Sequence, residues 1–255
     1  MLKIASWNVN SLNVRLPHVL AWLDAAQPDI LAIQETKLSD DKFPVEAIED
    51  AGYHSVFSGQ KTYNGVCIIS RKPASDIVTD IDGLEDPQRR ILAATIDGIR
   101  VINLYVVNGS EVGSEKFDYK MRWLEHVTAF IAAQMQLHKN VVVLGDFNIA
   151  PEDRDVHDPQ LWEGKILCSA AERSALHTIL ELGLSDTFRL FEQPEKSWSW
   201  WDYRMASFRR NLGLRIDLIL ASKPMSEVCT AAYIDVEPRR QERPSDHTPV
   251  VAEFG

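Results

Sequence analysis

Carboxylate and amide side chains follow apolar runs at several distant places in this chain. Glu35 follows LAIQ, Asp146 and Asn148 follow VVVLG, and Asp217 interrupts LRIDLIL. A carboxylate directly after a buried strand is costly unless it is paired, hydrogen-bonded or bound to a metal. Each of them alone is most simply a helix cap or a turn former. Several together indicate a functional site, because the ends of parallel strands meet at one rim, where open α/β sheets bind ligands.

The donor types of these side chains favour a hard cation. Oxygen ligands without clustered Cys or paired His suit Mg²⁺ or Mn²⁺ better than zinc. Mg²⁺ usually takes one or two protein carboxylates together with phosphate oxygens of the substrate, for which it acts as a Lewis acid. His247 stands beside Asp246, with Asp217 elsewhere in the chain. This pattern suggests an imidazole whose tautomer a carboxylate fixes, whereas a lone surface histidine is the simpler alternative.

Other hydrolytic chemistries lack their sequence signatures. The chain has no G-x-S-x-G segment for a serine nucleophile and no G-x-x-x-x-G-K-[ST] loop for a nucleotide triphosphatase. Cys67, Cys168 and Cys229 are odd in number and widely spaced, so we expect reduced core thiols of an intracellular protein. No apolar run is long enough for a membrane span and no signal peptide is visible, so we expect a cytoplasmic location.

The charge of the chain is uneven. Its 255 residues carry 27 Lys and Arg against 37 Asp and Glu, a formal net charge of −10, which argues against coating nucleic acid by bulk charge. The segment from Lys196 to Arg215, however, contains five cationic residues and only one acidic residue, Asp202, and aromatic residues are interleaved with them. Cations contact phosphates and aromatic faces stack on bases, although a solvated loop with buried aromatics is the alternative. We expect Arg209 and Arg210 in this segment to bind DNA, on a phosphate track that leads to the metal.

Short apolar, β-branched runs alternate with helical stretches and must position these side chains. The runs that predict strands are Leu2–Trp7, Ile30–Gln34, Gly65–Ser70, Ile91–Ile96, Ile99–Val107, Asn140–Gly145, Ile216–Ala221 and Pro249–Glu253. Apolar residues at steps of three and four predict a helix from Lys116 to Leu137, and two more helices are expected at Arg15–Ala25 and Ala171–Leu182. Two of the strand runs lack alternation, as strands covered on both faces do. The order of elements predicts an α/β protein with sheets at its centre and helices outside.

The chain has no low-complexity linker, and its size is sufficient for a core without disulfides or metal staples. We therefore expect residues 1–255 to form a single catalytic domain. A weak internal echo links SWNVNS with LGDFNIA, since both end a strand with a polar residue, a spacer and Asn. It reflects either two sheets of similar connectivity or chance.

Nine segments of the chain, in order, resemble motifs of the exonuclease III family of DNA-repair nucleases. They are WNVNS, IQETK, YNGVCIIS, DPQRRI, NLYVVNG, LGDFNIAP, SWWDYR, GLRIDLILAS and RPSDHTPV. The resemblance covers nearly the whole chain. It implies a deoxyribonuclease I-like fold, a four-layer α/β sandwich with two central mixed β-sheets packed face to face and helices outside.

The resemblance also implies a metal site and a water site. Glu35 matches the principal Mg²⁺ ligand, with Mn²⁺ as a possible substitute, and Asn8 and Asp246 lie nearby. Asp146 matches the residue that positions or deprotonates the attacking water, and Asn148 the residue that holds this water or the phosphate. These assignments agree with the metal and the oriented imidazole inferred from the residues alone.

Further matches concern the phosphate and the DNA. His247, oriented by Asp217, and Tyr105 match residues that contact the scissile phosphate and stabilise the transition state. Family members turn an abnormal nucleotide into a small hydrophobic pocket, and an abasic sugar enters at low cost because it has no base to unstack. The residues that match the pocket are Trp200, Leu214 and Ile216, and those that match the DNA backbone contacts are Lys61, Arg90 and Asn108.

One position departs from the family pattern. In KILCSAAERS, Leu167 stands where abasic-site endonucleases of this family usually have a small residue. A leucine there crowds the pocket or the strand that passes it. We therefore expect weakened incision at internal abasic sites, with retained removal of 3′-terminal blocks and 3′→5′ trimming.

Three functions compete at this point. The first is a Mg²⁺-dependent DNA phosphodiesterase with 3′→5′ exonuclease activity, which acts as a monomer on duplex DNA with abasic sites or blocked 3′ ends. The second is another hydrolase of the same scaffold, such as a phosphoinositide phosphatase, a sphingomyelinase or a deadenylase. These enzymes lack SWWDYR followed by GLRID. The third is a nucleic-acid-binding regulator without catalysis, although every expected catalytic position is filled here.

Overall fold

The computed structural model describes residues 1–255 and contains two six-stranded sheets. In spatial order the first sheet holds β11 (Cys229–Ile234), β12 (Val250–Phe254), β1 (Leu2–Asn8), β2 (Ile30–Gln34), β4 (Val66–Ser70) and β3 (His54–Ser58). The second holds β5 (Ser75–Val78), β6 (Ile91–Ile96), β7 (Ile99–Tyr105), β8 (Val141–Asp146), β10 (Asp217–Ser222) and β9 (Leu184–Asp186). Each sheet is mixed, because β1–β2 and β7–β8 are parallel and all other pairs are antiparallel.

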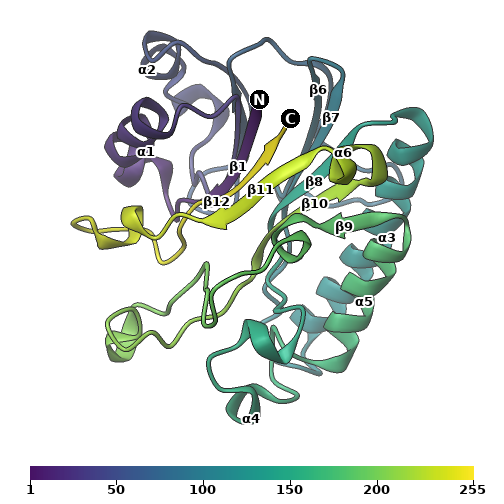
Figure 1. Ribbon diagram of the computed structural model, residues 1–255. Helices are drawn as coiled ribbons and strands as arrows, with labels where there is room; N and C mark the ends of the chain where they lie inside the picture. Colours follow the sequence, from purple (N-terminus) through teal and green to yellow (C-terminus); the bar gives the residue numbers. More distant parts are fainter.

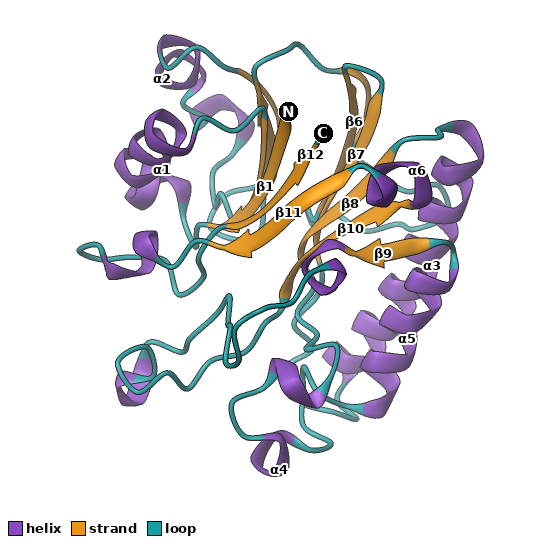
Figure 2. Cartoon of the chain, in the orientation of Figure 1, coloured by secondary structure: helices purple, strands orange, loops and turns teal.

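Helices cover the outer faces of both sheets, as Figures 1 and 2 show. α1 (Leu12–Ala26) and α2 (Val45–Asp50) lie outside the first sheet, and α3 (Glu115–Leu137) and α5 (Ala170–Glu181) lie outside the second. The short helices α4 (Pro159–Trp162) and α6 (Lys223–Glu227) sit in connections. The predicted four-layer α/β sandwich is confirmed. No helix is long and apolar enough to cross a membrane.

Apolar side chains on both faces of the central strands hold the layers together. In β8, Val142 and Leu144 pack between the sheets, whereas Val141 and Val143 pack against α3 and α5. A third apolar cluster joins β1 and β2 to α1. A strand that is buried on both sides needs apolar residues at every position, which explains the predicted runs without alternation.

All eight predicted strands are present within one or two residues of their expected ends, and the strands that sequence reasoning missed are the four sheet edges, β3, β5, β9 and β11. An edge strand has one neighbour and keeps polar residues exposed. β5, for example, is exposed at Ser75, Asp76 and Ile77. Such a segment lacks the apolar run that predicts a strand.

The two sheets have the same pattern of strand directions. In each sheet the central pair of strands is parallel, and all pairs on both sides of it are antiparallel. In this correspondence β1 matches β7 and β2 matches β8. The echo of SWNVNS on β1 and LGDFNIA on β8 therefore joins strands that are not equivalent. The matching carboxylates are Glu35, directly after β2, and Asp146, at the end of β8.

A buried polar network crosses between the sheets next to these strand ends. The side-chain amide of Gln34 in β2 donates to Ser6 Oγ at 3.0 Å and to Asn103 Oδ1 of β7 at 2.8 Å. Asn103 donates in turn to the carbonyls of Ile33 and Cys67 in the first sheet, at 3.0 and 2.9 Å. Because an unpaired polar group is costly in an apolar layer, this network fixes how the two sheets align.

Candidate active site

Side chains from both sheets meet at one end of the sandwich. Tyr105 and Asp217 are the register partners of Asp146 on the two neighbouring strands, so all three stand in one row across the second sheet. Asn8 ends β1 of the first sheet, and its amide donates to Asp146 Oδ2 at 2.9 Å and to Glu35 Oε1 at 3.0 Å. One amide thus joins the carboxylates of the two sheets.

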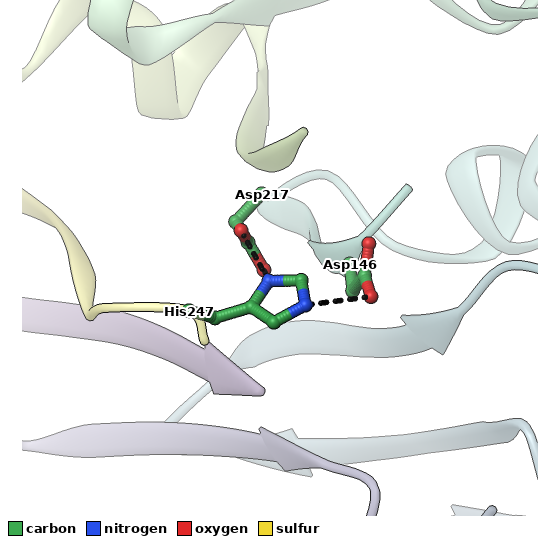
Figure 3. Close-up of side chains that lie close together, drawn as sticks. All are labelled: Asp146, Asp217 and His247. Carbon is green, nitrogen blue, oxygen red and sulfur yellow. Dashed lines mark hydrogen bonds and ion pairs between the residues drawn. The ribbon is translucent and has the colours of Figure 1, made fainter. Parts of the chain in front are cut away.

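His247 lies between two aspartates of the second sheet (Figure 3). Its Nδ1 is 2.8 Å from Asp217 Oδ2, and its Nε2 is 3.7 Å from Asp146 Oδ2, beyond hydrogen-bond range. All three side chains are buried. Burial alone would lower the pKa of His247, but the Asp217 and Asp146 carboxylates outweigh it and raise this pKa to about 10. The imidazole is therefore cationic at neutral pH, with the Nε2 proton free for a substrate oxygen.

Asp146 is held in a fixed orientation. Its Oδ1 accepts the backbone N–H of Asn148 at 2.9 Å, and its Oδ2 accepts the amides of Asn8 and, at 3.3 Å, of Asn148. Burial raises the pKa of Asp146 against the lowering effect of the His247 cation. A carboxylate with a raised pKa and fixed oxygens is suited to accept a proton from water.

Oxygen donors around Glu35 fit a hard divalent cation. The Glu35 carboxylate is only partly buried, and the Lys37 ammonium bridges its Oε2, at 3.0 Å, and Asn10 Oδ1, at 2.5 Å. An ammonium therefore already lies among these oxygens, and no thiolate or paired imidazole stands near to favour zinc. Asp146, Asp217 and His247, whose ligand atoms all lie within 4.8 Å of one another, form a buried acidic and histidine cluster consistent with a metal site.

Asp246 is connected to the site through two hydrogen-bonded neighbours. Its Oδ1 accepts the amide of Asn10 at 2.9 Å and its Oδ2 accepts the indole N–H of Trp200 at 3.0 Å. Asn10 thus stands between Asp246 and the Lys37–Glu35 pair. Asp246 joins the site through hydrogen bonds to its neighbours, with both oxygens engaged.

Tyr105 stands beside the carboxylates. Burial, together with the negative charges of Glu35 and Asp146, raises its pKa well above the ordinary range, so the phenol stays protonated and can donate. The Arg90 guanidinium lies over the Tyr105 ring, 4.6 Å from its centroid. Arg90 therefore lies next to Tyr105, which is one of the predicted catalytic residues.

Three of the predicted DNA-backbone residues lie on neighbouring loops. The amide of Asn108 donates to Asn148 Oδ1 at 3.2 Å, which attaches it to the site. Lys61 is exposed on a loop that hydrogen-bonds to the Arg89–Arg90 segment through Gln60 Oε1 and the Gly65 N–H.

Arg209 and Arg210 are also exposed, but neither makes a hydrogen bond or ion pair with the acidic cluster. Arg209 instead lines a cavity of about 770 Å³ with Trp201, Phe208 and Arg240.

The predicted pocket residues form one apolar cluster together with Leu167. Leu214 and Ile216 are buried, and Trp200 packs against them from beside His247, with 6.5 Å between the two ring centroids. Leu167 is 4% exposed and belongs to the same cluster. The side chain that departs from the family pattern therefore packs in the same apolar cluster as the predicted pocket residues.

Sequence reasoning missed several residues that position the site. Ser199 Oγ accepts the backbone N–H groups of Ile216 and Asp217, both at 3.0 Å, and so fixes the start of β10. Ser245 Oγ donates to the Asn8 carbonyl at 2.7 Å and accepts the His247 N–H at 3.2 Å. Ser199 between tryptophans and Ser245 beside Asp246 were the available signals.

The chain matches known proteins over its full length. The model of the Endonuclease/Exonuclease/phosphatase family matches residues 5–247. Exodeoxyribonuclease III of Haemophilus influenzae is 34% identical over 99% of this chain and 100% of its own.

Solved structures agree with these matches. The 3′ phosphatase NExo from Neisseria, bound to a product DNA hairpin, is 50% identical with a TM-score of 0.98 over 100% of both chains. An AP endonuclease from Archaeoglobus fulgidus is 42% identical with a TM-score of 0.96 over 100% of this chain and 99% of that one. Together with the buried Asp146–His247–Asp217 cluster, these matches show that the chain belongs to the endonuclease/exonuclease/phosphatase family, in the branch of exonuclease III-type DNA-repair nucleases.

Proposed function

We propose that residues 1–255 form one Mg²⁺-dependent catalytic unit that cleans and trims 3′ ends of duplex DNA and incises internal abasic sites poorly. The observation that carries the proposal is the place of Leu167 in the apolar cluster of Trp200, Leu214 and Ile216. An abasic sugar turned out of an internal site needs this space, whereas a terminal phosphate needs only the acidic cluster.

The residues divide the reaction among them. Glu35 and Asn8 would hold the metal, with Asp246 behind them, and Mg²⁺ bound there would supply a Lewis acid for the phosphate. Asp146 takes one proton of the attacking water, which the Asn148 amide holds. The water oxygen bonds to phosphorus as the bond from phosphorus to the leaving oxygen breaks, and the leaving oxygen takes a proton from solvent.

His247 donates its Nε2–H to a phosphate oxygen, while its Nδ1–H stays hydrogen-bonded to the Asp217 carboxylate. Tyr105 donates to a second phosphate oxygen. These donors are fixed before substrate arrives, which is the condition under which they stabilise developing charge most.

The backbone of Leu167 supports a role in selectivity. Its φ of 72° lies in the left-handed region, which costs an L residue about 1–2 kcal/mol and costs glycine almost nothing. The turn is nevertheless fixed, because the Leu167 N–H donates to Glu172 Oε1 at 3.0 Å and its carbonyl accepts the Ala150 N–H at 2.8 Å. Glycine fits this backbone better, so the leucine side chain is present in spite of local strain.

The relatives support both ends of the activity range. NExo of Neisseria, at 50% identity, is described as a 3′ phosphatase and also as a 3′–5′ exonuclease, the latter at 51% identity. The Archaeoglobus relative at 42% identity is described as an AP endonuclease. Efficient internal abasic-site incision is therefore the second candidate function.

A substitution at Leu167 separates these candidates. We expect wild-type protein to remove a 3′-phosphate much faster than it incises an internal tetrahydrofuran site, and Leu167→Gly to raise incision at least about tenfold with little change at the 3′ end. Asp97→Gly is the matched control, because Asp97 also has a positive φ, of 50°, but lies in the β6–β7 turn. Equal wild-type rates on both substrates would discard the proposal. An unchanged incision rate in Leu167→Gly would show that Leu167 does not limit it.

A further inference from the structure

A lysine with no exposed surface stands beneath the site. Lys120 belongs to α3, and its side chain is 0% exposed. Its ammonium donates to the carbonyls of Asn148, at 2.7 Å, and Asn108, at 3.2 Å, and to the Glu172 carboxylate. The three N–H donors of the ammonium thus have three acceptors, two of them on loops that carry site residues.

Glu172 completes this buried pair from α5. Its Oε1 also accepts the Leu167 N–H at 3.0 Å, and its Oε2 accepts the N–H and hydroxyl of Ser169 at 3.0 and 2.6 Å. This is a capping box at the start of α5, in which Ser169 returns a bond to the Glu172 N–H. The pair therefore joins the helix of Lys120 to the turn of Leu167.

The two loops that contact Lys120 have residues with positive φ and pack closely against its side chain. Asn148 has a φ of 48°, and its side chain bonds to Asp146 and Asn108. Gly109, with a φ of 90°, packs so closely that an added Cβ would lie 3.1 Å from Lys120 Cδ. The chain of contacts runs without a gap from Lys120 to the Asn148 carbonyl and on to the Asp146 carboxylate.

We propose that Lys120 and Glu172 form a positioning pair for DNA hydrolysis, which sets the Asn148 amide against Asp146 and holds the turn of Leu167 against the pocket. The proposal rests on the roles assigned above to Asn148 and Leu167. Stability alone is a weak reason to bury such a pair, because apolar residues of similar volume often replace one without loss. Apolar residues, however, donate nothing to the Asn108 and Asn148 carbonyls.

The test compares two buried polar pairs that each include one residue of α3. The first joins α3 to α5 and the second joins α3 to β7. Lys120→Met/Glu172→Gln neutralises the positioning pair without leaving one charge alone. The matched control is Arg100→Met/Gln134→Leu, which removes a buried bond of 2.7 Å between β7 and the far end of α3. Lys120→Arg keeps the buried cation. For each variant, kcat and KM are measured on a 3′-phosphate duplex, the rate on an internal tetrahydrofuran duplex, and the thermal unfolding midpoint.

The positioning role predicts a loss in kcat with little change in KM. A misplacement of about 1 Å costs up to about a hundredfold, so we expect kcat of the neutralised pair to fall about ten- to a hundredfold. We also expect its ratio of internal to terminal cleavage to rise, because the Leu167 turn loses its anchor. We expect Lys120→Arg to keep most of the wild-type kcat. The control pair should keep the full wild-type kcat, although its unfolding midpoint falls about as much as that of the neutralised pair.

Two results would overturn the proposal, and an additional variant tells them apart from failure of the proposed function. If the neutralised pair and the control pair lose the same stability and both keep kcat, the pair is structural only. Asn148→Ala tests the underlying role: a lost rate there with an intact rate in the neutralised pair refutes only the positioning. A full rate in Asn148→Ala refutes the assignment of Asn148 as well.

Discussion

Replacement of Asp217 by Asn tests how the site uses His247. The Asp217 carboxylate lies 2.8 Å from His247 Nδ1, and both residues are buried, at 1% and 4% exposure. At an effective dielectric constant of about 20, two unit charges at this distance interact by about 6 kcal/mol. A His247 pKa of about 10, against an ordinary value of 6.5, corresponds to a preference of about 5 kcal/mol for the cation. The net preference already includes burial, which is the largest single effect on this pKa and lowers it, and Asp217 is the largest of the effects that raise it.

The sign of the pH dependence follows. In wild-type protein the cation persists below pH 10 and is lost above it, so the rate should fall on the alkaline side of that value. In Asp217→Asn the pKa of His247 should fall toward neutrality, because burial is then opposed mainly by the more distant Asp146 carboxylate. At pH 7.5 the loss of one charged donor to the transition state should lower kcat by about a hundred- to a thousandfold.

Two measurements check this prediction. NMR titration of the His247 imidazole gives the pKa directly, and single-turnover rates on a 3′-phosphate duplex between pH 6 and 10 give the profile. The Arg100→Met/Gln134→Leu pair serves as the control for loss of stability. If Asp217→Asn leaves the imidazole cationic at pH 7.5, or lowers the pKa while the rate is kept, the assigned role of the His247 cation is wrong.

The remaining predictions concern the carboxylates and the basic segment. Glu35→Gln and Asp146→Asn should abolish turnover with little loss of DNA affinity, because both side chains act on the transition state more than on the ground state; a retained rate in Asp146→Asn would remove its role at the water. Arg209→Ala and Arg210→Ala should each weaken DNA binding and reduce the slope of log K against log salt by about 1. Both arginines are exposed and neither hydrogen-bonds to the acidic cluster. An unchanged slope would place them outside the DNA-binding surface.

The central strands were predictable because burial on both faces leaves a plain signal in the sequence. In β8 the run Val141–Leu144 is apolar at every position, and successive side chains enter two apolar layers in turn. The edge strands carry no such signal, since β5 exposes Ser75 and Asp76. Their pairing depends on the neighbour they meet in the fold, which local sequence does not specify.

The site shows the same division. Asp146, Asp217 and His247 were predictable, because a polar residue at the end of an apolar strand is conspicuous and the fold brings the three together. Lys120 was not predictable, because its role depends on the carbonyls of two loops outside α3, at Asn108 and Asn148. The partners of Asp246, which are the Asn10 amide and the Trp200 indole, were not predictable either. Such partners are set by tertiary contacts.

The most direct test of the account is a comparison of rates on three duplexes that carry a 3′-phosphate, an internal tetrahydrofuran site or an undamaged recessed 3′ end, each with Mg²⁺ and with EDTA. The account predicts cleavage only with Mg²⁺, fast at the 3′-phosphate and slow at the internal site, with trimming of the recessed end. Cleavage that persists in EDTA would contradict the metal site around Glu35, and internal incision as fast as 3′-phosphate removal would contradict the role of Leu167.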